Sequence, residues 1–122
     1  MHSESDFVAH LLELLHPVGG VTAKRMFGGY GLFRDGLMFG LVADGVLYLK
    51  ADEENRADFT DLGLPAFQYE TRDGRVSVMS YHQCPEDALE SPIVMTRWAR
   101  SAFAAAHRQA SRPKKSRRRP KD

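Results

Sequence analysis

Hydrophobic residues recur at helical spacing near both ends of the chain. In residues 3–16, SESDFVAHLLELLH, they follow an i, i+4, i+7, i+8 pattern, which places them on one face of a helix. Residues 92–107 have a similar stripe, and Pro92 after Ser91 suits the first helical position. The stripes consist of Phe7, Leu11, Leu14 and Leu15, and of Met95, Trp98, Ala99, Ala102, Phe103 and Ala106. We therefore predict two amphipathic helices that pack on a sheet.

Five short β-prone runs lie between these helices. Three Asp-Gly pairs, at residues 35–36, 44–45 and 73–74, separate neighbouring runs. Such a pair between apolar runs is a strong hairpin signal, because the favoured tight turn needs positive φ angles. The runs cover residues 25–33, 37–42, 46–50, 66–71 and 75–81. Each hairpin predicts an antiparallel pair of strands.

Two shorter helical segments are also expected. One lies within residues 53–62, where Asp52 can cap its start and Gly63 can end it. The other is a short turn in which Pro85 takes the first helical position after Cys84. The main elements then follow the order α-β-β-β-α-β-β-α. This order predicts an α+β fold with helices packed on one face of a five-stranded antiparallel sheet.

The glycine-rich stretch AKRMFGGYGLF, residues 23–33, resembles a phosphate-binding loop in composition. A phosphate-binding glycine loop joins a strand to a helix N-terminus, whereas this stretch runs into an Asp-Gly turn and another strand. We therefore interpret Gly29, Gly31 and Gly40 as packing devices that leave a shallow trough on one face of the sheet. We expect no nucleotide to bind there.

The charges divide the chain into an acidic body and a basic tail. Residues 108–122 hold eight basic residues and one acidic residue, which leaves nine basic against fifteen acidic residues in 1–107. The tail has no hydrophobic residue after Ala110, so we expect a folded domain over residues 1–107 and a disordered tail over 108–122. The predicted nucleic-acid-binding residues are Arg108, Arg112, Lys114, Lys115, Arg117, Arg118, Arg119 and Lys121.

Length and composition limit the classes of protein to which the chain can belong. The 122 residues fit one domain, and no run approaches the roughly 18 apolar residues of a membrane helix. No secretion signal is visible at the N-terminus, and a single cysteine cannot form an internal disulfide. We therefore expect a cytoplasmic protein that does not bind membranes.

Candidate catalytic residues are few. His82 and Cys84 lie two residues apart and resemble a base and nucleophile, but Glu86 and Asp87 disfavour a thiolate beside them. A third orienting group is not apparent, and the pair falls short of the four ligands of a zinc site. We interpret Cys84 as a small buried hydrophobic residue, and we predict no catalytic, cofactor-binding or metal site.

Residues 24–52, KRMFGGYGLFRDGLMFGLVADGVLYLKAD, resemble the N-terminal domain of the TfoX/Sxy family, the regulators of natural competence in bacteria. The likeness continues through LPAFQYE, VSVMSYHQCPEDAL and RWARSAFAAA, and so covers nearly all of residues 7–107. The resemblance implies an α+β domain with an antiparallel sheet and no known enzymatic activity. Full-length regulators of the family resemble a two-domain chain. We therefore expect a stand-alone N-terminal domain that lacks the helical C-terminal domain.

The resemblance implies a regulatory or adaptor function, as a transcriptional coactivator with a protein partner. By resemblance alone, that partner is a transcription regulator such as the cyclic-AMP receptor protein. The alternative reading rests on the tail, which would bind nucleic acid without sequence preference while the body serves as a scaffold. Arg97, Arg100 and His107 lie away from Trp98 on the last helix, and with Arg108 they would extend the positive surface of the tail.

Overall fold

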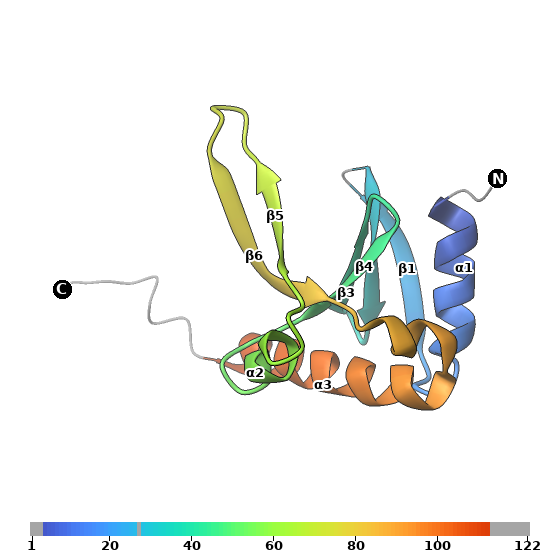
Figure 1. Ribbon diagram of the computed structural model, residues 1–122. Coiled ribbons are helices and arrows are strands. Elements are labelled where there is room, and N and C mark those ends of the chain that lie inside the picture. Colours follow the sequence, from blue (N-terminus) through green and yellow to red (C-terminus); the bar gives the residue numbers. More distant parts are fainter. Residues whose placement is uncertain (1–3, 27, 113–122) are drawn as a thin grey trace.

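The computed structural model describes residues 4–26 and 28–112. It contains three α-helices, a short 3-10 helix and six strands within that part of the chain (Figure 1). The helices are α1 (Glu4–Leu14), α2 (Arg56–Thr60), η1 (Glu86–Glu90) and α3 (Pro92–Ser111). The strands are β1 (Val21–Met26), β2 (Gly29–Arg34), β3 (Leu37–Ala43), β4 (Val46–Lys50), β5 (Ala66–Glu70) and β6 (Val76–Gln83). The predicted α+β class is confirmed.

The sheet has six antiparallel strands and not the five predicted, in the order β1-β2-β3-β4-β6-β5. The predicted strand 25–33 is divided by a tight turn that pairs Met26 with Gly29. Gly28 in this turn has a φ of +77°, a conformation that glycine adopts without steric cost. The prediction was wrong because the chain turns at Gly28, and Gly29 begins the next strand.

One face of the sheet is covered by α1 and α3. Leu11 of α1 and Leu15, which follows the helix, are buried together with Leu32, Phe39 and the other apolar residues of the inner strand face. The predicted stripe of α3 is confirmed. Its buried members are Met95, Ala99, Ala102 and Ala106, and its half-buried members Trp98 and Phe103 pack against the same core. The small alanines let the helix axis lie close to the sheet.

Local signals set the ends of the helices. The Ser91 hydroxyl accepts the N–H of Val94 at 3.2 Å, and Pro92 occupies the first turn of α3 as predicted. Pro85 instead precedes η1 as its extended N-cap residue, so the prediction that Pro85 takes the first helical position was wrong. The predicted helix over residues 53–62 was too long: α2 spans Arg56–Thr60 with Asn55, not Asp52, as its N-cap residue, and Gly63, with a φ of +72°, lies three residues after its end.

The β5–β6 hairpin projects from the rest of the sheet (Figure 1). Its strand β6 pairs with β4 over Tyr81–Gln83 only, and an additional backbone hydrogen bond joins Ala51 N–H to the Ser80 carbonyl. Residues 76–79 therefore pair with β5 alone. This arrangement makes the hairpin stand away from β1–β4 and leaves a space between the two parts of the sheet.

Candidate functional site

Two of the eight predicted nucleic-acid-binding residues belong to the described part of the chain. Arg112 is exposed at the C-terminal end of α3 and forms no ion pair with a described residue. Arg108 lies one helical turn earlier and forms an ion pair with Asp52. The other predicted residues, Lys114, Lys115, Arg117, Arg118, Arg119 and Lys121, lie outside the described residues.

Arg108 forms a two-pronged ion pair with Asp52. Its Nε lies 2.6 Å from Asp52 Oδ2, and its Nη2 lies 2.9 Å from Oδ1. The Asp52 side chain is 13% exposed, and its Oδ1 also accepts the N–H groups of Glu54 and Asn55. These contacts, the guanidinium foremost, lower the pKa of Asp52 to about 2. The charge of Arg108 is therefore compensated by the body of the protein.

The same cluster connects the loop after β4 to α3. The buried amide of Asn55 donates to the Lys50 carbonyl at 3.1 Å and to the Ser101 hydroxyl at 3.1 Å. Asp52 provides the second connection, through its ion pair with Arg108. Arg108 lies seven residues after Ser101 in α3. The predicted boundary after residue 107 falls inside α3, since the helix runs to Ser111. Arg108 is thus part of the folded unit.

His82 and Cys84 occupy structural positions. The imidazole Nδ1 of His82 donates to the Leu64 carbonyl at 2.8 Å, and the ring stacks on Phe59 at 5.4 Å between centroids. Cys84 is 3% exposed, and burial together with Asp87 raises the pKa of its thiol to about 12. A thiol in this environment stays protonated at neutral pH and is a poor nucleophile.

The face of the sheet opposite the helices carries an apolar groove of about 660 Å³ between β1–β3 and the β5–β6 hairpin. Its walls include side chains from both parts of the sheet. The apolar ones are Met26, Met38, Leu41, Phe67, Tyr69 and Met79. The Phe67 ring stands edge-on to Tyr48 at 4.9 Å, and Tyr69 stacks on Phe67 at 6.1 Å. The hairpin thus faces the sheet across this groove.

Glycines shape the floor of the groove. A Cβ on Gly31 would lie 2.8 Å from the sulfurs of Met26 and Met38, so both thioethers cover this glycine. A Cβ on Gly29 would lie 2.1 Å from the Val42 carbonyl oxygen, so this position accepts no side chain. Gly40 lies on the opposite face, beside Leu32. The predicted trough is therefore formed by two of the three glycines, and it is filled by methionines.

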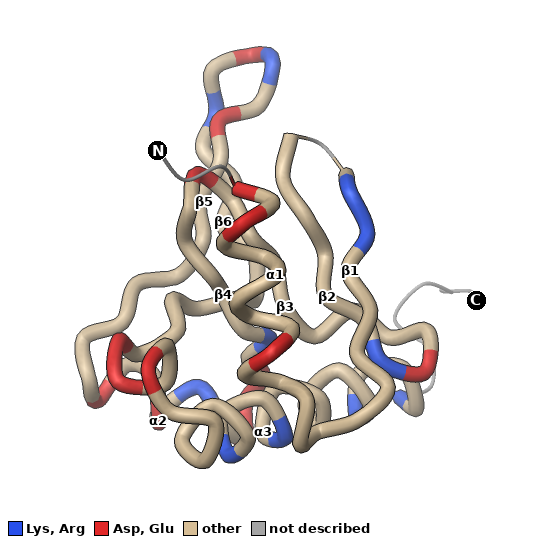
Figure 2. The backbone as a smooth tube through the Cα atoms, turned by 90° about the vertical axis from the view of Figure 1, so that its right-hand side faces the viewer, with Lys and Arg blue, Asp and Glu red and all other residues tan. Residues whose placement is uncertain are grey.

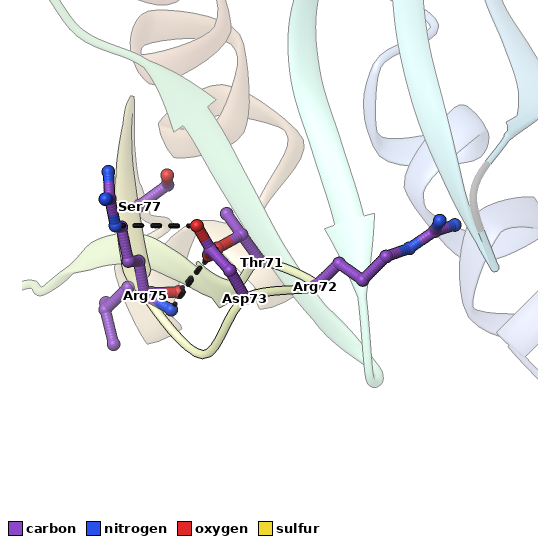
Figure 3. A pocket seen from close by; sticks show the side chains of 6 residues that line it. Thr71, Arg72, Asp73, Arg75 and Ser77 are labelled. Carbon is purple, nitrogen blue, oxygen red and sulfur yellow. Dashed lines mark hydrogen bonds and ion pairs between the residues drawn. The ribbon is translucent and has the colours of Figure 1, made fainter.

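Two cations, one on β1 and one at the hairpin tip, belong to the elements that form the groove walls but do not line the groove themselves. Lys24 shares the open face of β1 with Met26, because these residues pair with Gly31 and Gly29 of β2. Figure 2 shows this basic stretch of β1 and further charges at the projecting hairpin. Arg72 extends from the hairpin tip, away from the ion pair of Asp73 and Arg75 (Figure 3). Neither Lys24 nor Arg72 forms an ion pair with a described residue.

The hairpin tip also contains a shallow hollow, shown in Figure 3. The Asp73 carboxylate accepts from the Thr71 hydroxyl and from the N–H of Arg75, and the Thr71 hydroxyl also lies 3.2 Å from the Arg75 carbonyl. These hydrogen bonds close the turn on itself. The hollow is therefore a product of the turn, and the side chains of Thr71 and Asp73 are hydrogen-bonded within it.

Sequence reasoning did not identify the groove. Its three methionines come from three separate strands, and no local pattern connects them. The alternation of Phe67 and Tyr69, continued by Met79 on the next strand, was the available signal, since side chains two residues apart share a face of a strand. That signal identifies a face of the hairpin but not the surface that it faces.

The sequence is similar to one family model and to two known proteins. The family model described as the TfoX N-terminal domain matches residues 13–106. DNA transformation protein TfoX1 of Aliivibrio fischeri is 42% identical over 52 residues, which are 43% of this chain and 25% of that protein. Protein Sxy of Escherichia coli is 28% identical over 99 residues, which are 81% of this chain and 47% of that protein. The matches thus span half or less of the length of these relatives.

Proposed function

Because the chain belongs to the TfoX N-terminal domain family, we propose that it is a regulatory adaptor domain that acts by binding a protein partner. The match over residues 13–106 carries this proposal, since it extends from the end of α1 across all six strands and into α3. Among the described side chains, no three His, Cys, Asp or Glu residues gather as metal ligands. The protonated thiol of Cys84 adds no nucleophile.

The finer role in this proposal is transcriptional coactivation in the cytoplasm. No helix in the described part of the chain is long and apolar enough to cross a bilayer. By family resemblance, the candidate partner is a transcription regulator such as the cyclic-AMP receptor protein. Titration of the purified chain with that regulator in a calorimeter tests the pairing, and the absence of a saturable heat of binding would exclude this partner.

Transcript profiling tests the regulatory role itself. Cells that lack this gene are compared with the same cells complemented by the full chain or by an empty vector. We expect a defined set of transcripts to change several-fold on deletion and to return with the full chain. Identical profiles in all three strains would contradict the proposal.

A second candidate function is binding of nucleic acid by the basic tail. From Arg112 onward the sequence holds seven basic residues and one acidic residue, Asp122. Such a basic segment neutralises phosphates without contacts that distinguish the bases. Arg108 contributes less to this function, because Asp52 compensates its charge. If about five of these residues contact phosphates at once, log K should fall with log salt at a slope near −4 to −5 on duplex DNA.

Fluorescence anisotropy on a random DNA duplex at several salt concentrations measures this slope. The informative truncation ends after Arg112, because it keeps α3 and the ion pair of Arg108 with Asp52 intact. We expect the truncated chain to lose binding and to keep its melting temperature. Full affinity after truncation would place the nucleic-acid site on the body.

A further inference from the structure

The groove exposes apolar side chains that the rest of the chain leaves uncovered. Tyr69 is 46% exposed, and the neighbouring Met26, Met38, Leu41 and Met79 are only partly buried. Removal of apolar surface from water is favourable, so this surface would favour any ligand that covers it. An open apolar surface bordered by polar residues is typical of an interaction site.

The lining suits the side chains of a protein partner. Methionine has three rotatable bonds and a polarisable sulfur, so Met26, Met38 and Met79 can adapt to apolar residues of different shapes. The rings of Phe67 and Tyr69 supply a stiffer wall on the hairpin side. Grooves of this composition accept the apolar face of an amphipathic helix.

The charges at the groove favour a partner of one sign. Lys24 on the open face of β1 and Arg72 at the hairpin tip are unpaired among the described residues, while Asp44 is the one carboxylate in the lining. Among the other charges of the hairpin, Asp73 and Arg75 lie 3.5 Å apart and compensate each other, and Glu70 lies on the far face, where it pairs with Val76. Carboxylates on a bound segment would therefore find two free cations.

We propose that this groove is the docking site for an acidic amphipathic segment of a partner protein. Apolar side chains of the segment insert among the methionines between the hairpin and β3, and its flanking carboxylates pair with Lys24 and Arg72. The inference rests on the proposed adaptor function and adds to it the site and the chemistry of the partner. The chain's own tail does not fit, because residues 113–122 contain no hydrophobic residue and are strongly basic.

The test uses the full chain and a synthetic probe. The probe is a fluorescein-labelled peptide with Leu and Phe at i, i+3, i+4 and i+7 and Glu on the flanking positions, and a second peptide has Lys in place of Glu. We expect the acidic peptide to bind with rising anisotropy and the basic peptide to bind at least about tenfold more weakly. Equal affinity for the two peptides, or no binding of the acidic one, would overturn the proposal.

A matched pair of variants locates the site. Met79→Glu places a carboxylate in the groove wall, whereas Val78→Glu places it one residue earlier, on the far face of the same hairpin, where the side chain is 62% exposed. We expect Met79→Glu to weaken the acidic peptide about tenfold and Val78→Glu to leave it unchanged. Lys24→Glu, at an exposed position, should weaken it about fivefold even if Met79→Glu fails to fold. If every variant that folds binds the acidic peptide equally well, the groove is not the binding site.

Two further readouts separate the remaining outcomes. If light scattering finds a dimer that Met79→Glu converts to a monomer, the occupant is a second copy of the chain and the proposal is overturned. In the transcript assay, Met79→Glu should fail to restore the profile that Val78→Glu restores. If deletion changes the transcripts and both variants restore them, the groove proposal fails while the regulatory function stands. If deletion changes nothing, the regulatory function fails.

Discussion

Leu32 and Leu41 lie on adjacent strands and on opposite faces of the same sheet. Leu32 is fully buried beneath the helices, whereas Leu41 is partly exposed in the groove. The helical face is closed because the alanines of α3 let a whole helix approach it, and the other face stays open because the hairpin stands across from it. A hydrophobic side chain in this sheet is therefore a core residue or a binding residue according to what covers its face.

The largest expected difference between the two faces comes from truncating these leucines. Leu32→Ala leaves a cavity in a closed core and should lower the free energy of unfolding by ~3 to 4 kcal/mol, while Leu41→Ala should lower it by ~1 kcal/mol because solvent already reaches the groove. Urea denaturation followed by circular dichroism measures both. Equal losses would mean that the groove is closed in solution.

The two groove glycines should respond differently to an added methyl group. Gly29→Ala collides with a backbone oxygen, at 2.1 Å from the ideal Cβ, and should cost ~2 to 3 kcal/mol as β2 and β3 shift apart. Gly31→Ala meets the movable sulfurs of Met26 and Met38 and the edge of the Phe33 ring, and should cost less than ~1 kcal/mol. Thermal melts of both variants make the comparison. A larger loss for Gly31→Ala would contradict the assignment of a rigid backbone contact to Gly29 alone.

The ion pair on the closed side should matter more than an exposed charge on the same helix. Arg108→Ala leaves the largely buried Asp52 without its partner and should cost ~1 to 2 kcal/mol of unfolding free energy. Arg100→Ala, at an exposed position of α3, should stay within about 0.5 kcal/mol of the parent chain. Chemical denaturation of the two variants gives the difference. Similar values would show that the ion pair contributes no net stability.

The same pair predicts a pH dependence. The pKa of Asp52 is about 2 in the folded chain and 3.8 for an unperturbed carboxyl, so its contribution is present above about pH 4 and is lost as pH falls toward 2. The unfolding free energies of the parent and of Asp52→Asn are measured from pH 6 to about pH 2. The difference between them should shrink by ~1 kcal/mol as the pH falls over this range. Asp58→Asn, at an exposed acid of α2, is the control. A difference between parent and Asp52→Asn that is constant over this range would contradict the assignment.

Local sequence signals predicted most of the helices and hairpins. The stripe of α3, the Ser91-Pro92 start and the three Asp-Gly turns act over a few residues, and each was found at its expected place in the chain. The first two Asp-Gly pairs have positive φ at both residues, whereas at 73–74 only Gly74 does. The division of strand 25–33 was missed because adjacent glycines permit either an extended strand or a tight turn. Only the pairing of Met26 with Gly29 decides between the two.

The contacts that define the candidate sites depend on distant parts of the chain. Helical periodicity placed Arg108 on an outer face, but Asp52, its partner, is 56 residues away in sequence. The groove likewise requires Met79 on the hairpin to face Met38 on β3, and this depends on the short pairing between β4 and β6. No window of neighbouring residues contains either relationship.

The short base of the hairpin has a mechanical consequence. Three residues, Tyr81–Gln83, attach β6 to β4, and Lys50 reinforces this base through its Nζ, which lies 2.7 Å from the Ser80 hydroxyl and over the Tyr81 ring. Beyond the base, the hairpin is a two-stranded arm whose tilt changes when a few hydrogen bonds bend. The width of the groove can therefore change while the core under α1 and α3 keeps its packing. One body of this shape can hold segments of different thickness, and amide hydrogens at residues 76–79 should exchange with solvent well before those of the core.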